Sequence, residues 1–575
     1  MTERDEARNG GAHGDARGER FAPVGYEEWR ARVEEELRGA PFERLVSTLP
    51  GRIDVQPLYH ERPWGEGDDP RGLPGTAPFV RGGRPAGEAG AWLRCARIDA
   101  PDPEAAKTAL AADLRGGCDA LWLELDVFPR PDAGIGTAAD LVGRLGDEPG
   151  AAGSGGGAGA DGGARGLSSP GSPGDRSGGG IPISSPKALA ALLREVDLER
   201  VALFLDAGVG SMDAAALAFD LLGMRRADRG RVALFLGVDP IGALAADGAS
   251  TEPLEDFDPW MAALAVRCAA TLPRSRAIGV SALPWHEAGA TPAQELGWAV
   301  ATLVRYLRRM EEAGLGAEAA AGQVELRVAV GRDLFLGIAK LRSLRLLWAK
   351  LLGVCGVVNS PPPFIHAVSS DRALARRDPF TNMLRVTTEV FAAVAGGADA
   401  ITAAPYDRLL PSAGEPAGSR LGRRTARNTQ HVLAEEAHLG RVADPAGGSY
   451  YLETLTEELA RAAWDELRRV EASGGIAEHL RSGRLREEAE AAWQEQRRAL
   501  VAGAEPVLGV SLYPPPADER AEEADGGRRP QVSRRAEGVL AGEFVGPLPR
   551  HRLAEPFEDD GVAPPAAAGA AEKPA

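Results

Sequence analysis

The sequence predicts an α/β protein built on a (β/α)8 TIM barrel, with an N-terminal arm and a C-terminal helical extension. Between residues 92 and 450, short apolar runs rich in β-branched residues alternate with helical patterns. The run Arg200–Leu205 recurs almost unchanged as Arg231–Leu236, at the spacing of one strand–helix unit. Because these runs are apolar almost throughout, they suit parallel strands that are buried on both faces.

Eight strands are predicted, and eight parallel strands that alternate with helices close into a barrel more readily than into another arrangement. They are expected at Leu121–Val127, Val201–Ala207, Val232–Val238, Ala277–Leu283, Val324–Val330, Phe364–Ser369, Ala398–Ala403 and Arg441–Ala443. The alternative is an open doubly wound sheet, but no Gly-rich phosphate turn follows a first strand.

The helices between the strands carry their own signals. Thr291-Pro292-Ala293-Gln294 combines an N-cap, a proline at the first helical position and a capping-box partner. Further helices are predicted at Leu334–Leu352 and Met383–Ala395.

The segments outside the barrel are predicted from composition and periodicity. We expect a disordered N-terminus over 1–20, then a helix at 26–38 and an extended, proline-punctuated interface arm that together fill 21–91. Within the barrel span of 92–450, residues 145–180 are predicted to be a disordered Gly/Ser-rich insertion. A helical extension over 451–511, with helices at Leu455–Ala472 and Ile476–Leu500, is followed by a disordered tail over 512–575.

Charge and composition exclude several classes of function. The 66 basic and 83 acidic side chains give a net charge of −17, which argues against binding to nucleic acid. No run of 18 apolar residues predicts a membrane span, and the polar start carries no signal peptide, so a cytoplasmic protein is expected. The four cysteines have no paired spacing for a metal or redox site.

An active site in such a barrel would lie at the carboxyl ends of the strands. The chemistry-bearing residues expected there are Asp126, Asp206, Asp239, Trp285, His286, His366, Tyr406 and Asp444. Aspartate and histidine could serve acid–base or metal chemistry. The structural alternative is that the aspartates cap helices or order turns and that each histidine is a satisfied polar group.

Several longer motifs occur along the chain: Pro57-Leu58-Tyr59, Pro78-Phe79-Val80-Arg81-Gly82, the helix from Leu334 to Leu351, Asp378-Pro379-Phe380-Thr381-Asn382, Ala426-Arg427-Asn428-Thr429-Gln430 and the run from Arg441 to Tyr451. They resemble motifs of the methylmalonyl-CoA mutase family, and the resemblance covers about residues 21 to 510. The resemblance implies a cobalamin-dependent acyl-CoA mutase barrel that is threaded by its acyl-CoA substrate.

Positions that the family uses for catalysis are altered. Ala96 stands where the resemblance places a tyrosine against the corrin, and Val368, two residues after His366, stands where it places a glutamine. The family's Tyr-His pair corresponds either to Leu283-Pro284 or, with a two-residue deletion, to Trp285-His286. His286 and His366 remain candidate substrate contacts, and no catalytic or metal-binding residue is assigned.

The resemblance therefore implies the non-catalytic small subunit of a methylmalonyl-CoA mutase, which supports a catalytic large subunit. Adenosylcobalamin is expected in the complex but not on this chain, since none of the eight histidines lies in an Asp-x-His-x-x-Gly context and the 75 residues beyond Leu500 are too few for a cobalamin domain. Pro547–Glu558 resembles the family's linker to that domain. One alternative is an active acyl-CoA mutase barrel that binds acyl-CoA and uses a separate cobalamin-binding chain. A scaffold with no mutase partner is the other.

Overall fold

The computed structural model describes residues 25–60, 71–85, 92–127, 180–250, 252–410, 416–516 and 542–564. The chain divides into two compact units, Met1–Pro63 and Trp64–Ala575. The disorder predicted for 1–20 and for 145–180 concerns residues outside the described ranges, except for Gly180, which is described and buried.

The first unit is small and has little core of its own. It holds helix α1 (Tyr26–Glu36), the 3-10 turn η1 (Phe42–Leu45) and an antiparallel hairpin of β1 (Ser47–Leu49) and β2 (Ile53–Val55). The rings of Trp29 and Phe42 meet edge to face, with 6.1 Å between their centroids. No residue of α1 is fully buried in the structure, so this unit leaves its helix available for contacts.

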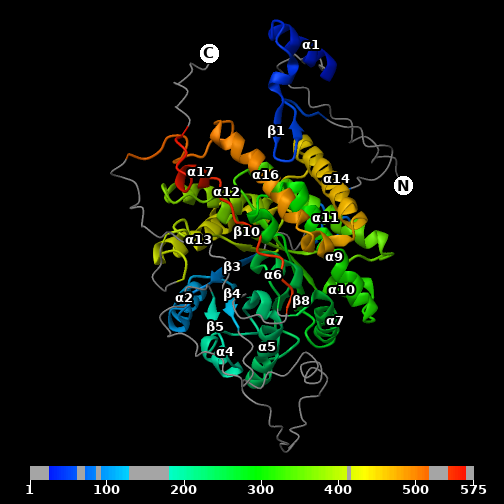
Figure 1. The fold of residues 1–575 in the computed structure, drawn as a ribbon, viewed down its shortest axis with the longest axis vertical. Coiled ribbons are helices and arrows are strands. Elements are labelled where there is room, and N and C mark those ends of the chain that lie inside the picture. Colours follow the sequence, from blue (N-terminus) through cyan, green and yellow to red (C-terminus); the bar gives the residue numbers. More distant parts are fainter. Residues whose placement is uncertain are drawn as a thin grey trace, which may run out of the picture. The chain divides into compact units, whose positions relative to one another are not determined.

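The second unit is a closed barrel of parallel strands (Figure 1). Going around the barrel, the strands are β3 (Leu93–Ile98), β11 (Ala400–Thr402), β10 (Phe364–Ser369), β9 (Val324–Val330), β8 (Arg276–Ser281), β7 (Leu234–Val238), β6 (Ala202–Asp206) and β4 (Ala120–Asp126). Pairing of β3 with β4 closes the ring, and a short strand, β5 (Ile181–Pro182), extends β4 outside it. The predicted (β/α)8 barrel is confirmed.

One predicted strand is wrong. Arg441–Ala443 forms no strand: Leu439–Arg441 is a 3-10 turn, η6, and the next residues bend toward Asp444, which has a φ of 47°. The missing eighth strand is β3, which the prediction overlooked because Arg94 and Arg97 interrupt its apolar run. Both arginines are paired, Arg94 with Asp119 at 2.9 Å and Arg97 with Glu124.

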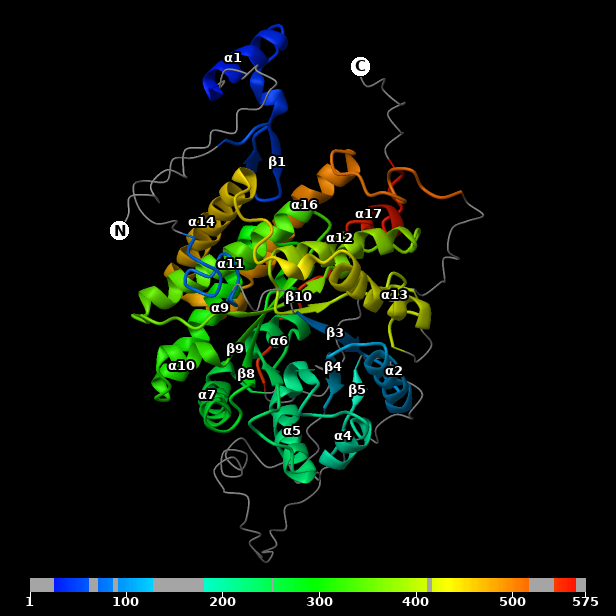
Figure 2. The same ribbon diagram turned by 180° about the vertical axis from the view of Figure 1, so that it is seen from behind.

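Helices surround the barrel on its outside (Figure 2). They are α2 (Pro103–Arg115), α4 (Pro186–Leu192), α5 (Ser211–Arg225), α6 (Pro240–Asp247), α7 (Leu254–Thr271), α8 (Leu283–Glu287), α9 (Pro292–Glu312), α10 (Ala317–Gly322), α11 (Leu334–Val354), α12 (Thr381–Ala395) and α13 (Arg420–His431). The predicted capping box is present at α9, where Thr291 and Gln294 bond each other's backbone.

The helical extension packs against α9 and α11. It consists of α14 (Tyr450–Ala472), α15 (Gly475–Arg481) and α16 (Arg484–Val501). The single helix predicted over Ile476–Leu500 is interrupted at Gly483, whose φ of 79° is a left-handed conformation that ends α15.

The predicted disordered tail is wrong for the part that the structure describes. Residues 542–564 pack on the barrel and include helix α17 (Glu555–Glu558). Leu553 and Phe557 join a core cluster with Trp493 and Leu500 of α16. The composition of the tail predicted disorder. It gives no information about the packing partners of this segment, which come from distant parts of the chain.

The motifs that carry the family resemblance form a buried charge network. Arg342 of α11, which is fully buried, binds Asp444 and lies 2.8 Å from a carboxylate oxygen of Glu453. Arg81 lies 3.5 Å from Asp444 and Arg71 lies 3.0 Å from Glu453, so the segment 71–85 is held against α11 and α14. These motifs therefore maintain packing between elements.

We expect the substitution Arg342→Met to lower the free energy of unfolding by about 3 kcal/mol, because it removes one partner of a buried ionic network. Arg461→Met is the matched control, since Arg461 and Glu457 form an exposed pair, which contributes about 0–1 kcal/mol. Denaturant unfolding of the two variants measures both effects. Equal losses would show that the network adds no specific stability.

Candidate functional site

The residues predicted at the strand ends do not converge on one site. Asp239 caps α6 and accepts a hydrogen bond from the Tyr306 hydroxyl at 2.6 Å. Trp285 is fully buried against Trp298, and Asp444 belongs to the Arg342 network. Tyr406 stacks on Phe380 with ring centroids 5.4 Å apart. These four residues have structural roles.

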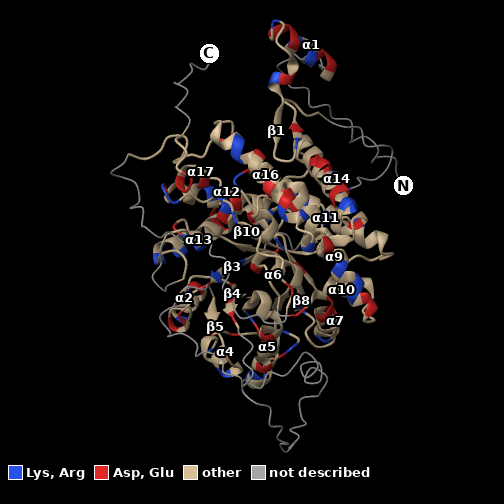
Figure 3. Cartoon of the chain, viewed as in Figure 1, with Lys and Arg blue, Asp and Glu red and all other residues tan. Residues whose placement is uncertain are grey.

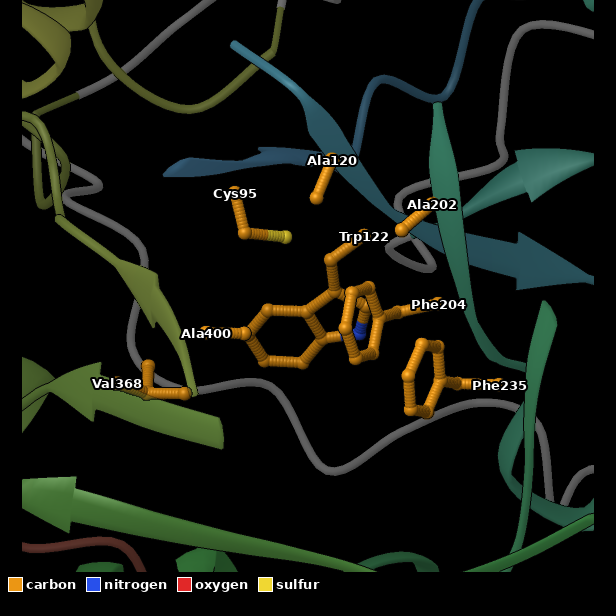
Figure 4. Close-up of a cluster of buried hydrophobic side chains, with 8 residues drawn as sticks. All are labelled: Cys95, Ala120, Trp122, Ala202, Phe204, Phe235, Val368 and Ala400. Carbon is orange, nitrogen blue, oxygen red and sulfur yellow. The ribbon is translucent and has the colours of Figure 1, made fainter. Parts of the chain in front are cut away.

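Aromatic side chains fill the barrel interior, and Figure 4 shows three of them, Trp122, Phe204 and Phe235, with smaller residues around them. Trp122 and Phe204 face each other in the register of β4 and β6, and Phe204 and Phe235 in that of β6 and β7. The Phe204 and Phe235 rings stack at 4.2 Å with an interplanar angle of 9°. The ring of Phe364, on β10, lies 4.5 Å from that of Phe235. The contact between Phe235 on β7 and Phe364 on β10 joins strands that are not neighbours in the ring, so it reaches across the barrel interior.

Charged side chains form the next layer toward the carboxyl ends of the strands. Arg327 lies 3.1 Å from Asp206 and 3.2 Å from Glu325. The guanidinium carbons of Arg97 and Arg327 lie 4.5 Å and 4.6 Å from the centroid of the Trp122 ring. Both distances are within the range of a cation–π contact, so the charged layer is anchored on the aromatic one.

A second group of ion pairs lies beyond this layer. Arg408 is 2.9 Å from Asp371 and 2.9 Å from Asp99. Arg97, besides its bond to Glu124, is 3.7 Å from Asp371. Sequence patterns missed these residues because every pair joins different strand ends. The sequence signal that could have indicated such ion pairs is a charged residue inside an otherwise apolar strand, such as Glu325 or Arg327.

His366 lies inside the barrel and both of its ring nitrogens are engaged. Nδ1 is 3.2 Å from Glu325, and Nε2 is 2.8 Å from the Thr402 hydroxyl. Burial lowers the pKa of His366, and the hydrogen bond from its Nδ1 to Glu325 opposes this only in part. The ring is therefore neutral near pH 7, donating from Nδ1 to Glu325 and accepting from Thr402.

His286 lies near the end of the short helix α8, in a separate buried group. Its Nδ1 is 3.1 Å from Glu295 and its Nε2 is 2.7 Å from the Ser370 hydroxyl. Glu295 also pairs with Lys340, whose Nζ donates to the Ala329 carbonyl at 2.8 Å. Burial lowers the pKa values of both His286 and Lys340. The two candidate histidines are thus in different networks, and each is satisfied by the protein.

A pocket is lined by residues of β3, β10 and β11 and of the helices α2 and α13, and Ala96 and Val368 are part of its wall. These are the two positions at which the sequence departs from the expected tyrosine and glutamine. Arg423 and Arg427 also line the pocket, and both are paired with Asp113 of α2. The pocket therefore offers small side chains and neutralised charges where the resemblance placed polar catalytic groups.

Residues 545–553, which we call the strap, lie over the loops that follow three barrel strands. Their backbone amides donate to Gly248 and Ala245 after β7, to Glu287 after β8 and to Arg372 after β10, at 2.8–2.9 Å. Figure 1 shows this red segment running from α17 past β10 to α6. Arg550 of the strap lies 3.2 Å from Glu287. The strap thus covers part of the carboxyl-end face of the barrel.

Within the described residues, no group of three or more His, Cys, Asp or Glu side chains is arranged to hold a metal ion. In the same part of the chain, none of the helices combines the length and the hydropathy needed to cross a bilayer.

We expect folded-state stability to fall as the pH is lowered from 7 to 5, because both buried histidines have lowered pKa values and the unfolded chain takes up protons first. The substitution His366→Gln removes one of these groups, so the slope of unfolding free energy against pH becomes shallower by up to about 1.4 kcal/mol per pH unit. Denaturant unfolding at several pH values measures the slope. His438→Gln, at an exposed histidine, is the matched control, and an unchanged slope in His366→Gln would contradict the prediction.

Comparisons with known proteins agree with the fold and the motifs. The family model described as methylmalonyl-CoA mutase matches residues 166–536. The chain is 37% identical to the methylmalonyl-CoA mutase small subunit of Streptomyces virginiae over 531 residues, which cover 89% of this chain and 75% of that protein. It is 33% identical to the small subunit from Propionibacterium freudenreichii subsp. shermanii over 516 residues, 86% of this chain and 69% of that protein.

The large subunit from Streptomyces virginiae is also similar, with 37% identity over 253 residues that cover 43% of this chain and 34% of that protein. The matches to small subunits extend over most of the chain, and the family model covers more than half of it. The chain belongs to the methylmalonyl-CoA mutase family.

Proposed function

We propose that this chain is the non-catalytic small subunit of a cobalamin-dependent methylmalonyl-CoA mutase, which interconverts methylmalonyl-CoA and succinyl-CoA. In this role it supports a catalytic large subunit and performs no chemistry itself. The observation that carries the proposal is the filled interior of the barrel. A substrate that threads the barrel would need the volume that the rings of Trp122, Phe204, Phe235 and Phe364 occupy.

Rotating these rings to open space for a substrate would cost free energy. Phe204 contacts His366 from the opposite side of the barrel at 4.7 Å between ring centroids, and Trp122 carries the two guanidinium groups above it. Protein interiors are close-packed, and moving one such ring displaces its neighbours. The interior is therefore a packed core without room for an acyl-CoA chain.

The polar groups near the strand ends also support a structural role. A general acid or base must direct the atom that gives or takes the proton at the substrate. Both nitrogens of His286 and of His366 bind protein atoms, and the carboxylates of Asp206, Glu325 and Asp371 are paired with arginines. Their hydrogen bonds hold the strands together.

The residues at the carboxyl-end face do not fit a corrin ring. The strap occupies the loops after β7, β8 and β10, and small residues, Ala96 and Val368, stand where contacts to the cofactor or substrate would be needed. We therefore assign adenosylcobalamin to the complex and to the large subunit, and derive no reaction step on this chain.

The partner in this proposal is the catalytic large subunit. The relatives are named as small subunits, and a named large subunit is itself similar to this chain. In the first unit, α1 buries none of its residues completely, although it carries the aromatic side chains of Tyr26 and Trp29. Such a helix is suited to packing against another chain. A cytoplasmic location, as expected from the sequence, belongs to the same proposal.

The test is turnover of the assembled pair. We expect His286→Gln and His366→Gln in this chain to leave kcat per assembled complex within twofold of wild type, since neither histidine contacts substrate. A loss of about 100-fold, the usual contribution of an acid–base group, would favour an active barrel that uses a separate cobalamin-binding chain. The amount of complex, measured by size-exclusion chromatography, normalises the rates.

A binding measurement tests the filled barrel directly. Titration of the assembled pair with propionyl-CoA, a short acyl-CoA, is expected to give one site per pair. Two sites per pair would contradict the proposal, because this chain's barrel would then also take the ligand.

A further inference from the structure

A buried carboxylate of helix α17 is held by two backbone amides of the loop between β10 and α12. The amides of Arg376 and Arg377 both donate to Oε1 of Glu558, at 2.9 Å and 2.8 Å. The side chain of Glu558 is only 3% exposed. Successive backbone amides that point to one spot form an anion-binding concavity. We call these two amides, together with the guanidinium groups of Arg376 and Arg552, the nest.

The two guanidinium groups of the nest bind a second carboxylate as well. Arg552 lies 2.6 Å from Oε2 of Glu558 through Nη1 and 2.6 Å from Asp559 through Nη2. Arg376 binds Asp559 and lies 3.6 Å from Oε2 of Glu558. Hydrogen bonds between ionised groups are the strong ones in proteins. Glu558 and Asp559 carry one negative charge each, which balances the two guanidinium groups.

A third guanidinium group lies beside the nest. Nη2 of Arg377 donates to the Phe557 carbonyl at 2.9 Å, and its buried Nε has no hydrogen-bond partner among the described residues. The next acidic residue along the loop is Asp378, which accepts hydrogen bonds from the amide and the hydroxyl of Thr381 at the start of α12. The carboxylates in the nest therefore come from α17 and the residue after it.

The nest also lies where barrels of this kind often bind phosphate. In chain order β10 is the seventh strand of the ring, and the nest belongs to the loop after it. Loops after the seventh and eighth strands frequently form a phosphate site. Helix α17 lies beside α12 in both ribbon views (Figures 1 and 2), and Figure 3 shows its acidic residues in red. Position alone identifies no ligand, but here the converging amides and guanidinium groups agree with it.

We propose that the nest is a phosphate-binding site, which Glu558 and Asp559 fill in cis. The ligand is a phosphate dianion, because its three acceptor oxygens and charge of about −2 can use the same amides and guanidinium groups as the two carboxylates. A tethered group competes at an effective concentration in the millimolar range, so phosphate exchanges with α17. The inference does not depend on the proposed function, since neither a large subunit nor an acyl-CoA takes part in the exchange.

The experiment uses the full-length chain with both carboxylates removed. In Glu558→Ala/Asp559→Ala, about 20 mM inorganic phosphate is expected to raise the folded-to-unfolded ratio roughly twentyfold over chloride of the same ionic strength, as for a dissociation constant of about 1 mM. The wild-type chain is expected to respond several-fold less, because its own carboxylates compete. Asp560→Ala is the matched control, since Asp560 is the next acidic residue but pairs with Arg497 of α16.

Acetate tests whether the nest recognises phosphate or any carboxylate. It is expected to stabilise the double variant at least about fivefold less than phosphate at the same concentration, because it carries a single charge and one pair of oxygens. Equal stabilisation by acetate would overturn the assignment to phosphate. A double variant that responds to phosphate no more than Asp560→Ala does would overturn the site.

Hydrogen exchange of the wild-type chain covers the case in which the double variant does not fold. The amides of Glu558 and Asp559 are bonded to carbonyls one turn earlier in α17. With about 100 mM phosphate in place of chloride they are expected to exchange faster, because α17 leaves the nest. The amides of Arg376 and Arg377 are expected to stay protected, since phosphate replaces the carboxylate. Faster exchange at all four amides, or at none, would contradict the replacement of one anion by the other.

Discussion

The closed ring of parallel strands imposes one constraint on the rest of the structure: the space that the ring encloses must be filled. Here the filling is aromatic, and the contact between Phe204 and His366 spans the ring from one side to the other. The charged layer of Arg97, Glu325 and Arg327 depends on it, because two of the guanidinium groups lie over Trp122. The same packing that stabilises the barrel also removes the space that a substrate would need.

The sequence predicted the barrel because its strands are short, apolar and separated by helical patterns. It misplaced one strand, since β3 contains Arg94 and Arg97, and the partners that make these arginines acceptable, Asp119 and Glu124, belong to the next part of the chain. Residues 441–443 looked like a strand in isolation. In the structure they lead into Asp444, which is held by Arg342 from a helix about a hundred residues earlier.

The sequence indicated residues of the candidate site, but not whether their hydrogen-bonding atoms are free or bound to other protein groups. The sequence indicated His286 and His366. His286 follows the carboxyl end of β8, whereas His366 lies inside the barrel in the first half of β10. Their hydrogen-bond partners, Ser370 and Thr402 among them, are 84 and 36 residues away in the chain. Whether a histidine is free or satisfied depends on such distant groups, and no local pattern reports them. The departures at Ala96 and Val368 could be found only by comparison with a family pattern.

The strap has a consequence for biosynthesis. It is joined by backbone hydrogen bonds to loops near residues 248, 287 and 372, so one short segment made late in translation clamps three loops made much earlier. The ring itself also waits, since β3 pairs with β11 some three hundred residues later. Contacts between such distant positions are slow to form, because the intervening chain must first be brought together. A nascent barrel would therefore expose its unfinished edge strands at least until β11, at Ala400–Thr402, has been made, and such exposed edges favour aggregation of folding intermediates.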